Sequence, residues 1–212
     1  MPDSELTQVE RYLPVPSKLV RHDQGCCQCA LAWFRGVDAQ ESFIDGRWQP
    51  PSWLRRRYEW GPARWPIHWC DVPQMERLDC GALAAVAVHL YQMRGHRAVP
   101  VQLALRYPVH ALQQWSAMWE RQGLASDWIA GRLCYHEACG VIHDSELQVW
   151  DPTENRWLEP PSSRNDAFGA VVSLRLFPGD EAQEELQWAG IRVRTGVWRS
   201  LPFDEQGHLV PG

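Results

Sequence analysis

Residues 77–96 have the sequence RLDCGALAAVAVHLYQMRGH, and this stretch decides the fold. A polar, turn-rich region gives way here to a long apolar run. Asp79 is a residue type that caps helix N-termini, and Gly95 is one that ends helices. We therefore expect a helix from Cys80 to about Arg94. Apolar residues lie on nearly every face of that helix, which predicts a central helix packed on more than one side.

Cys80 would lie in the first turn of this helix, where a thiol is expected to be reactive. The positive end of the helix dipole and the free backbone N–H groups favour the thiolate over the thiol. A lone buried cysteine at a helix start is nevertheless more often structural than catalytic. The interpretation of Cys80 as a nucleophile therefore depends on a base elsewhere in the chain.

The rest of the chain predicts an α+β fold in one domain. Residues 1–75 are rich in tryptophan and proline and predict an irregular segment with some strand, integral to the fold, because the prolines break any long element. Residues 76–212 are expected to form the catalytic core and the C-terminal strands. Within them, the hydrophobic patterns predict a strand over 98–105, a helix over 109–122, a hairpin of 132–142 and 146–150 that turns at 143–145, a strand over 169–177, and a second hairpin in which Thr195-Gly196 joins 191–194 to 197–198.

Composition limits the class of protein and its partners. A hydrophobic content of 45% with 22% charged residues predicts a globular protein with a real core, and a net charge of -5 argues against nucleic acid as the main partner. There is no apolar run long enough to span a membrane, and the first residues lack the features of a signal peptide. We therefore expect a soluble, cytoplasmic protein with reduced cysteines and no membrane partner.

Seven cysteines raise the question of metal or redox chemistry. Cys26 and Cys29 have C-x-x-C spacing, but no second closely spaced pair completes a zinc site unless His68 and Cys70 do so. We favour the interpretation that Cys26, Cys27 and Cys29 are small buried residues. No acidic loop has the pattern of a calcium site, and we expect no metal and no cofactor.

A base and a carboxylate that could orient it are available downstream of Cys80. His136 falls within the first strand of the predicted hairpin, and Asp151 follows the second. In a hairpin that turns near residue 144, the two are almost equally far from the turn, so their side chains can be cross-strand neighbours. The carboxylate would then bond one imidazole nitrogen while the other faces a thiol. Each has an alternative: a strand histidine is more often a satisfied polar residue, and 151–154 is also a good cap and turn sequence.

Three segments, taken in order, resemble the transglutaminase-like branch of the papain-like cysteine enzymes. Residues 80–99 are similar to the family's nucleophile helix, glycine turn and following strand. Residues 136–141 are similar to its histidine strand, and residues 147–153 to the aspartate strand that ends in Asp-Pro-Thr. The resemblance covers about residues 78–155. Each motif is short, and their order and spacing make the resemblance specific.

The resemblance implies a papain/transglutaminase-like core, in which a central nucleophile helix packs on an antiparallel β-sheet. It also implies a catalytic triad. In that triad Cys80 is the nucleophile, His136 is the general base and acid, and Asp151 orients His136.

Two features depart from the family pattern. Family members commonly carry an aromatic residue soon after the histidine, where this chain has Glu137 and Ala138. The oxyanion-stabilising residue has no clear match: Gln74 lies six positions before the cysteine, as in papain-type enzymes, and Trp69 or another upstream tryptophan could act as in transglutaminases. Gln74 is equally well explained as a loop residue. The backbone N–H of Cys80 should supply one donor in either case.

Such a triad performs acyl transfer on an amide bond through a thioester intermediate. We favour hydrolysis of a peptide or isopeptide bond, which makes the protein a peptidase or amidase with a peptide or protein substrate. The alternative is a transglutaminase-type acyltransferase with an amine acceptor, which the upstream tryptophans would favour if they exclude water, although tryptophans more often serve packing. A non-catalytic binding module of the same fold is a third possibility, against which the intact triad argues.

Overall fold

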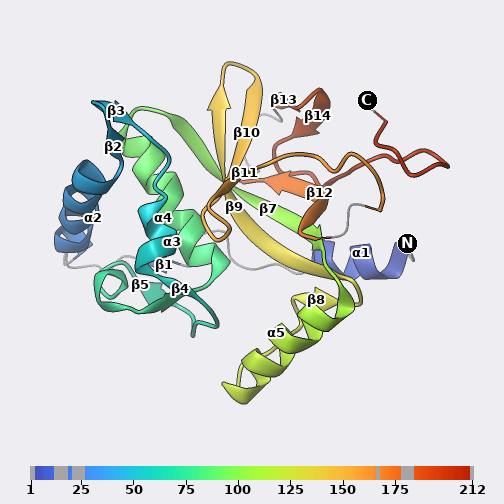
Figure 1. The fold of residues 1–212 in the computed structure, drawn as a ribbon, viewed down its shortest axis with the longest axis horizontal. Coiled ribbons are helices and arrows are strands. Elements are labelled where there is room, and N and C mark those ends of the chain that lie inside the picture. Colours follow the sequence, from blue (N-terminus) through green and yellow to red (C-terminus); the bar gives the residue numbers. More distant parts are fainter. Residues whose placement is uncertain (1–2, 12–18, 21–26, 166–167, 178–183, 211–212) are drawn as a thin grey trace.

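A sheet of nine strands forms the centre of the molecule in the part of the chain that the computed structural model describes, residues 3–11, 19–20, 27–165, 168–177 and 184–210 (Figure 1). The strand order is β14-β13-β10-β9-β7-β12-β15, while β8 pairs with β9 and β11 with β10. Neighbouring strands are antiparallel except for β10 and β13. The strands are β7 (Arg97–Arg106), β8 (Ile129–Ala130), β9 (Leu133–His143), β10 (Glu146–Asp151), β11 (Arg156–Leu158), β12 (Ala170–Leu176), β13 (Glu185–Trp188), β14 (Ile191–Arg194) and β15 (Arg199–Ser200).

The central helix lies where the sequence predicts it. α4 spans Cys80–Met93, and the Asp79 carboxylate caps its N-terminus by accepting a hydrogen bond of 3.0 Å from the backbone N–H of Ala82. Gly95 follows with a φ of 81°, the left-handed conformation that ends many helices. α4 contacts β7 and β9 as well as α2 (Cys27–Glu41), which explains why its apolar residues are buried on several faces. The expectation of a mixed α and β fold is thereby confirmed.

Most of the elements predicted after this helix are also present. The helix expected over 109–122 is α5 (Val109–Arg121). The strands expected over 98–105, 132–142, 146–150 and 169–177 are β7, β9, β10 and β12. β7, β9 and β12 are buried along most of their length, so both faces of these strands lie in the interior.

The second predicted hairpin is wrong. β13 and β14 form the hairpin, and they are joined by Ala189 and Gly190, which have positive φ angles of 48° and 81°. Gly196 does turn the chain, with a φ of 76°, but the residues beyond it pair with β12 as β15 rather than with β14. A Thr-Gly pair therefore predicts a turn correctly without saying which strand the chain joins next.

The N-terminal segment is more helical than the sequence predicts. α2 is 15 residues long, because no proline lies between Pro16 and Pro50 to break it. No helix in the described ranges is long and apolar enough to span a membrane. The remaining elements of this segment are α1 (Asp3–Arg11), α3 (Trp53–Arg57), the 3-10 helix η1 (Val72–Gln74), and the short strands β1 (Leu19–Val20), β2 (Phe43–Ile44), β3 (Arg47–Trp48), β4 (Glu59–Trp60), β5 (Ile67–His68) and β6 (Arg77–Leu78).

Two hydrophobic clusters build the core. The first lies on the sheet and includes Leu103 of β7 and Leu174 of β12. The second surrounds α4 and includes Leu83 of that helix and Phe34 of α2. Trp60 packs against both clusters and marks their junction.

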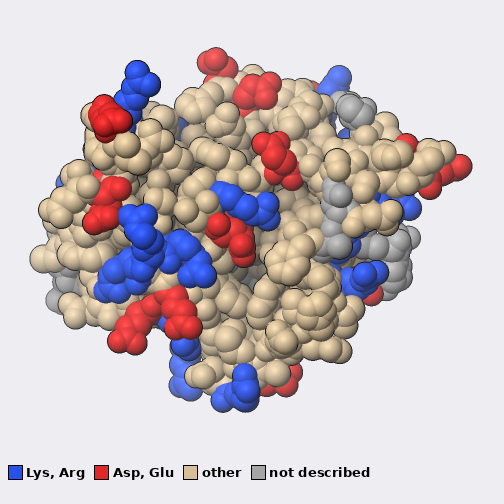
Figure 2. All heavy atoms as spheres, in the orientation of Figure 1, with Lys and Arg blue, Asp and Glu red and all other residues tan. Residues whose placement is uncertain are grey.

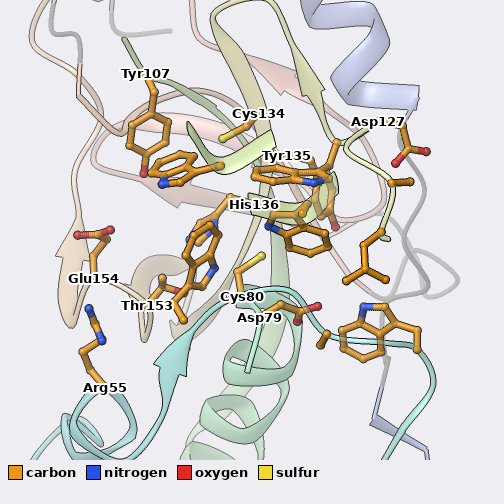
Figure 3. A pocket seen from close by; sticks show the side chains of 18 residues that line it. Arg55, Asp79, Cys80, Tyr107, Asp127, Cys134, Tyr135, His136, Thr153 and Glu154 are labelled. Carbon is orange, nitrogen blue, oxygen red and sulfur yellow. The ribbon is translucent and has the colours of Figure 1, made fainter. Parts of the chain in front are cut away.

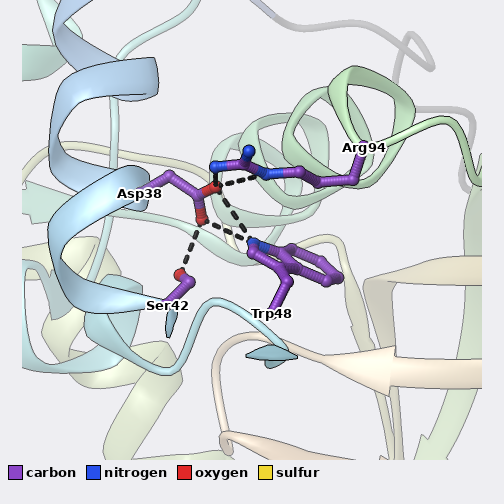
Figure 4. Close-up of polar contacts among 4 residues, drawn as sticks. All are labelled: Asp38, Ser42, Trp48 and Arg94. Atoms are coloured by element: carbon purple, nitrogen blue, oxygen red, sulfur yellow. Dashed lines mark hydrogen bonds and ion pairs between the residues drawn. The ribbon is translucent and has the colours of Figure 1, made fainter. Parts of the chain in front are cut away.

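A buried carboxylate ties α2 to the C-terminal end of α4 (Figure 4). Asp38 of α2 is 0% exposed and accepts hydrogen bonds from Ser42 Oγ at 2.6 Å and from Trp48 Nε1 at 3.0 Å. Arg94, which follows α4, donates to it from Nε at 3.0 Å and completes an ion pair. We call these four residues the Asp38 cluster. The cluster fastens α2 to the end of α4 by polar contacts, whereas the two helices otherwise meet through apolar side chains.

Charged side chains of both signs lie next to one another on the face of the molecule shown in Figure 2. Exposed ion pairs of the chain include Arg56–Glu41 and Arg77–Glu59, each 2.9 Å long. Such pairs are screened by water and salt and contribute little to stability. The buried Asp38 cluster is therefore the more important polar contact of the N-terminal segment.

Candidate active site

Cys80, His136 and Asp151 meet at the N-terminal end of α4. The Cys80 side chain points toward the His136 imidazole of β9 (Figure 3), and the Cys80 sulfur is close enough to raise the pKa of that imidazole. His136 is 7% exposed, and Asp151 at the end of β10 is fully buried. Cys80 and His136 line one cavity of about 260 Å³. One helix and two adjacent strands thus bring together the three residues expected to form a triad.

His136 and Asp151 are joined by a short contact between Nε2 and Oδ2, which are 3.0 Å apart. They are diagonal rather than direct cross-strand neighbours, because Trp150 pairs with Cys139 and His136 is two residues from the position opposite Asp151. An offset of two keeps both side chains on one face of the sheet, and diagonal partners remain within reach. The expected contact is present, with a register two residues from the one expected.

The backbone after β10 holds the Asp151 carboxylate in place. Its Oδ1 accepts hydrogen bonds from the N–H groups of Thr153 at 2.8 Å and Glu154 at 3.3 Å, which leaves Oδ2 for His136. Burial raises the pKa of Asp151, but His136 and the two backbone N–H groups lower it more, so the net pKa lies below its usual value. The Asp-Pro-Thr-Glu turn therefore orients an ionised carboxylate toward the histidine.

The His136 imidazole is held in its protonated form. Burial lowers the pKa of His136, but the charge of Asp151, the Cys80 sulfur and the hydrogen bonds to both raise it well above its usual value. Since Asp151 bonds Nε2, the other ring nitrogen, Nδ1, is left for the thiol. A protonated imidazole beside a sulfur stabilises the thiolate, the form of cysteine that attacks carbonyls. The site thus places a protonated imidazole beside the Cys80 sulfur.

A second cysteine that lines the cavity, Cys134, is not activated in this way. Cys134 lies two residues before His136 on β9 and also lines the cavity. Its burial, and secondly the charge of Cys80, raise the pKa of the Cys134 thiol well above its usual value. Cys134 therefore stays a neutral thiol, and the geometry favours Cys80 as the nucleophile.

Tryptophan and tyrosine rings form a large part of the cavity wall. They stack edge to face across the chain: the ring centroids of Tyr107 and Trp115 are 4.8 Å apart, and those of Trp60 and Trp115 are 5.4 Å apart. Arg55 and Glu154 lie on one side of Cys80 and Asp127 on the other (Figure 3). The aromatic lining residues are Trp60, Trp65, Tyr107, Trp115, Trp119, Trp128 and Tyr135.

The two residues suggested for the oxyanion are not brought to this site. Gln74 is exposed at the end of η1, and Trp69 is buried against Phe34, with ring centroids 5.6 Å apart. Neither lines the cavity within the described residues. Trp60, another tryptophan upstream of Cys80, does line it, and its Nε1 has no hydrogen-bond partner there. Trp60 is therefore the better candidate donor.

The cysteines near α2 lie apart from the cavity. Cys27 is buried, and its sulfur is 3.3 Å from that of Cys70. The interpretation as a small buried residue holds for Cys27 and is wrong for Cys29, which is exposed because it faces away from the core on α2. Cys26 lies outside the described residues. Among the residues that are described, no three metal-ligating side chains gather.

Sequence reasoning missed the part of the cavity that comes from α5 and the loop after it. Trp115 and Trp119 are four residues apart and so share a face of α5, which the sequence signalled only as a core stripe. Trp128 gave no signal at all. Only the packing of α5 beside β9 and β4 brings these groups to Cys80.

No family model, curated protein or solved structure matches the chain.

Proposed function

We propose that this protein is a cysteine-dependent enzyme that hydrolyses an amide bond of a peptide or protein through a thioester. The observation that carries the proposal is the continuous contact from Asp151 through His136 to Cys80, with 3.0 Å between the carboxylate and the imidazole. A carboxylate that orients a base, and a base that contacts a nucleophile, form the unit that activates a thiol. The cavity beside the sulfur provides room for a substrate.

The reaction has two steps. The Cys80 thiolate attacks the carbonyl carbon, the C–N bond breaks, and protonated His136 gives its proton to the leaving amine. Neutral His136 then takes a proton from water, the resulting hydroxide attacks the thioester, and the C–S bond breaks to release the acid and restore the thiolate–imidazolium pair. Asp151 stays ionised and keeps the imidazole in its orientation throughout.

The oxyanion of each step needs donors in fixed positions. The backbone N–H of Cys80 lies in the first turn of α4, where N–H groups have no partner within the helix. The indole N–H of Trp60 is a second donor that lines the same cavity without a partner among the described residues. Two such donors beside a cysteine at a helix N-terminus are what a transglutaminase-like or papain-like core requires, and we propose a core of that kind at the level of the fold.

Transfer to an amine is the second candidate, and the aromatic wall favours it. Rings from β4, α5 and the segment before β8 surround the sulfur, and such a lining limits the access of water to a thioester. An amine acceptor would then attack in place of water, with the same proton transfers through His136. A binding module without chemistry is a third candidate, which the same experiment separates from both.

Trapping of the acyl-enzyme tests these candidates. The purified chain is incubated with peptides from a cell-extract digest, quenched with acid during turnover and measured by intact-mass spectrometry. We expect an added acyl mass on Cys80 that hydroxylamine removes, and none on a Cys80→Ala variant. Addition of methylamine distinguishes the acceptors, since a transferase gives methylamides and a hydrolase gives acids. A chain that never carries an acyl mass, in the wild type or in a His136→Ala variant, is not an enzyme of this class.

A further inference from the structure

The cavity beside Cys80 contains buried hydrogen-bonding groups that the chain itself does not use. The indole N–H groups of Trp119 and Trp128 and the hydroxyl of Thr153 have no hydrogen-bond partner among the described residues. All three line the cavity, and Trp128 and Thr153 are only 7% and 8% exposed. Native proteins rarely leave such groups unsatisfied, so unpartnered polar groups on residues that line a cavity indicate that something bound there can pair with them.

Ring contacts hold the two indoles in position. The centroids of Trp119 and Trp128 are 5.1 Å apart, and Trp60 lies 6.5 Å from Trp128 on another side. Trp60 also contacts Trp115, so rings from three segments of the chain brace one another. Because turning an indole would break these contacts, the N–H groups are donors in fixed positions, as a specific binding site requires.

The charges around the cavity disfavour an anionic ligand. Three carboxylates, Asp79, Asp127 and Glu154, line it, whereas Arg55 and His136 are the two cationic groups among the described lining residues. A carboxylate or phosphate group would meet repulsion from these three carboxylates. The oxygen that accepts from the indoles should therefore belong to a neutral group, and an amide carbonyl is the strongest neutral acceptor common in biological molecules.

We infer that the side of the cavity formed by Trp119 and Trp128 binds the acyl part of a peptide, a bulky apolar side chain whose neighbouring backbone carbonyl accepts from an indole N–H. This inference rests on the proposed function, which places the scissile carbonyl at Cys80. A hydrocarbon acyl chain would fill the apolar wall and leave the N–H groups unsatisfied. A cation would use the ring faces and likewise leave the N–H edges without a partner.

Binding without chemistry tests the inference directly. The Cys80→Ala variant is labelled with [indole-¹⁵N]tryptophan, and the Nε1–H signals are followed by NMR as N-acetyl-L-phenylalaninamide is added. We expect the signals of Trp119 and Trp128 to move downfield in a saturable way, as hydrogen bonds form. Trp128→Phe keeps an aromatic ring and removes the donor, and it should weaken the Kd about fivefold to tenfold.

Trp53 provides the matched control. Its Nε1 is also buried without a partner among the described residues, but Trp53 does not line the cavity. Its signal should not move, and Trp53→Phe should bind the amide as the parent does. Since the shifts are measured on the parent protein, they remain informative if a tryptophan variant folds poorly.

Three further probes give the opposing outcomes. Ethylbenzene offers the ring without carbonyls, benzyltrimethylammonium offers a cation, and 3-phenylpropanoate offers the ring with an anion and no amide. If any of them shifts the two signals as far as the amide does, or if the amide does not bind, the inference is overturned. Amide binding without an acyl-enzyme would instead contradict only the proposed function, and an acyl-enzyme without amide binding would contradict only this inference.

Discussion

Two carboxylates in this chain, Asp38 and Asp151, are both 0% exposed, yet their surroundings differ. The partners of Asp38 converge on its oxygens and then pack on other rings, Trp48 against Tyr91 and Arg94 over Phe43. None of these residues lines the cavity beside Cys80. The contacts of Asp151 continue through His136 to a sulfur that lines a cavity. The difference teaches that burial and hydrogen bonding do not by themselves mark a catalytic acid. What distinguishes Asp151 is that its partner, His136, has a second ring nitrogen that is available to act on another group.

The contacts that begin at Asp151 end at Cys80, and the loss of Cys80 should have the largest effect on turnover. We expect Cys80→Ala to reduce turnover about 10⁴-fold or more, because no thioester can form. Turnover of a peptide substrate found by the trapping experiment measures this. Cys134→Ala is the matched control, since Cys134 lines the same cavity as a neutral thiol. Equal losses in both variants would remove the reason to assign the nucleophile to Cys80.

Asp151→Asn tests whether the carboxylate acts through His136. The amide keeps the shape of the side chain but no longer holds the imidazole in its charged form and orientation, so we expect kcat to fall about 10²-fold to 10⁴-fold. Asp38→Asn should leave kcat within a few-fold of the wild-type value, because the Asp38 cluster has no contact with the cavity lining. The contrast between the two carboxylates fails if Asp151→Asn turns over as fast as Asp38→Asn.

Asp38→Ala should show the reverse pattern, with a large effect on folding. It leaves the Arg94 guanidinium and the Trp48 indole without their acceptor, and breaking a buried ion pair costs about 3–5 kcal/mol. Urea denaturation gives the free energy of unfolding. Glu41→Ala is the control, since it removes an exposed ion pair with Arg56 and should cost less than about 1 kcal/mol. Similar losses for the two variants would mean that Asp38 does not fasten α2 to α4.

A smaller effect should appear in the pH dependence of stability. The folded-state pKa of His136 is raised, so its contribution is complete below the unfolded value of about 6.5 and is lost as pH rises through the folded value. The folded-state pKa of Asp151 is lowered, so its contribution is present above the unfolded value of about 3.9 and is lost as pH falls through the folded value.

We therefore expect the stability difference between the wild type and His136→Gln to be largest between about pH 4 and 6.5 and to narrow at pH 9 to 10. Urea midpoints at pH 5.5 and 9.5 measure it. Arg94→Gln should cost the same at both pH values, because a guanidinium does not titrate in that range. A difference for His136→Gln that grows toward alkaline pH contradicts the charged pair.

The central helix and the meeting of Cys80, His136 and Asp151 could be predicted because their signals are local. An N-cap, an apolar run and a glycine stop occur in direct succession around α4, and a short hairpin leaves few registers for His136 and Asp151. The register itself was off by two, because the sequence does not fix the centre of a turn to one residue. The contact survived this error, since an even offset keeps both side chains on one face.

What could not be predicted depends on contacts between distant segments. α2 buries Asp38 beside apolar residues, and this polar side chain weakens the helical pattern of its sequence. Its partner Arg94 is 56 residues away, so nothing local announces the pair. The cavity wall likewise joins Trp60 to residues of α5 and to Trp128. Residue propensity and hydrophobic periodicity describe neighbours along the chain, so they contain no information on contacts between distant segments.

Trp60 has a consequence for how the protein should respond when its cavity is filled. Its indole packs against both hydrophobic clusters, so a ligand that immobilises it couples the unfolding of the sheet to that of the α4 region. A ligand at a hundred times its Kd stabilises the folded state by about 2.7 kcal/mol. Slower amide exchange should then extend into α2, far from any atom the ligand touches. One side chain would make two cores open as a single unit.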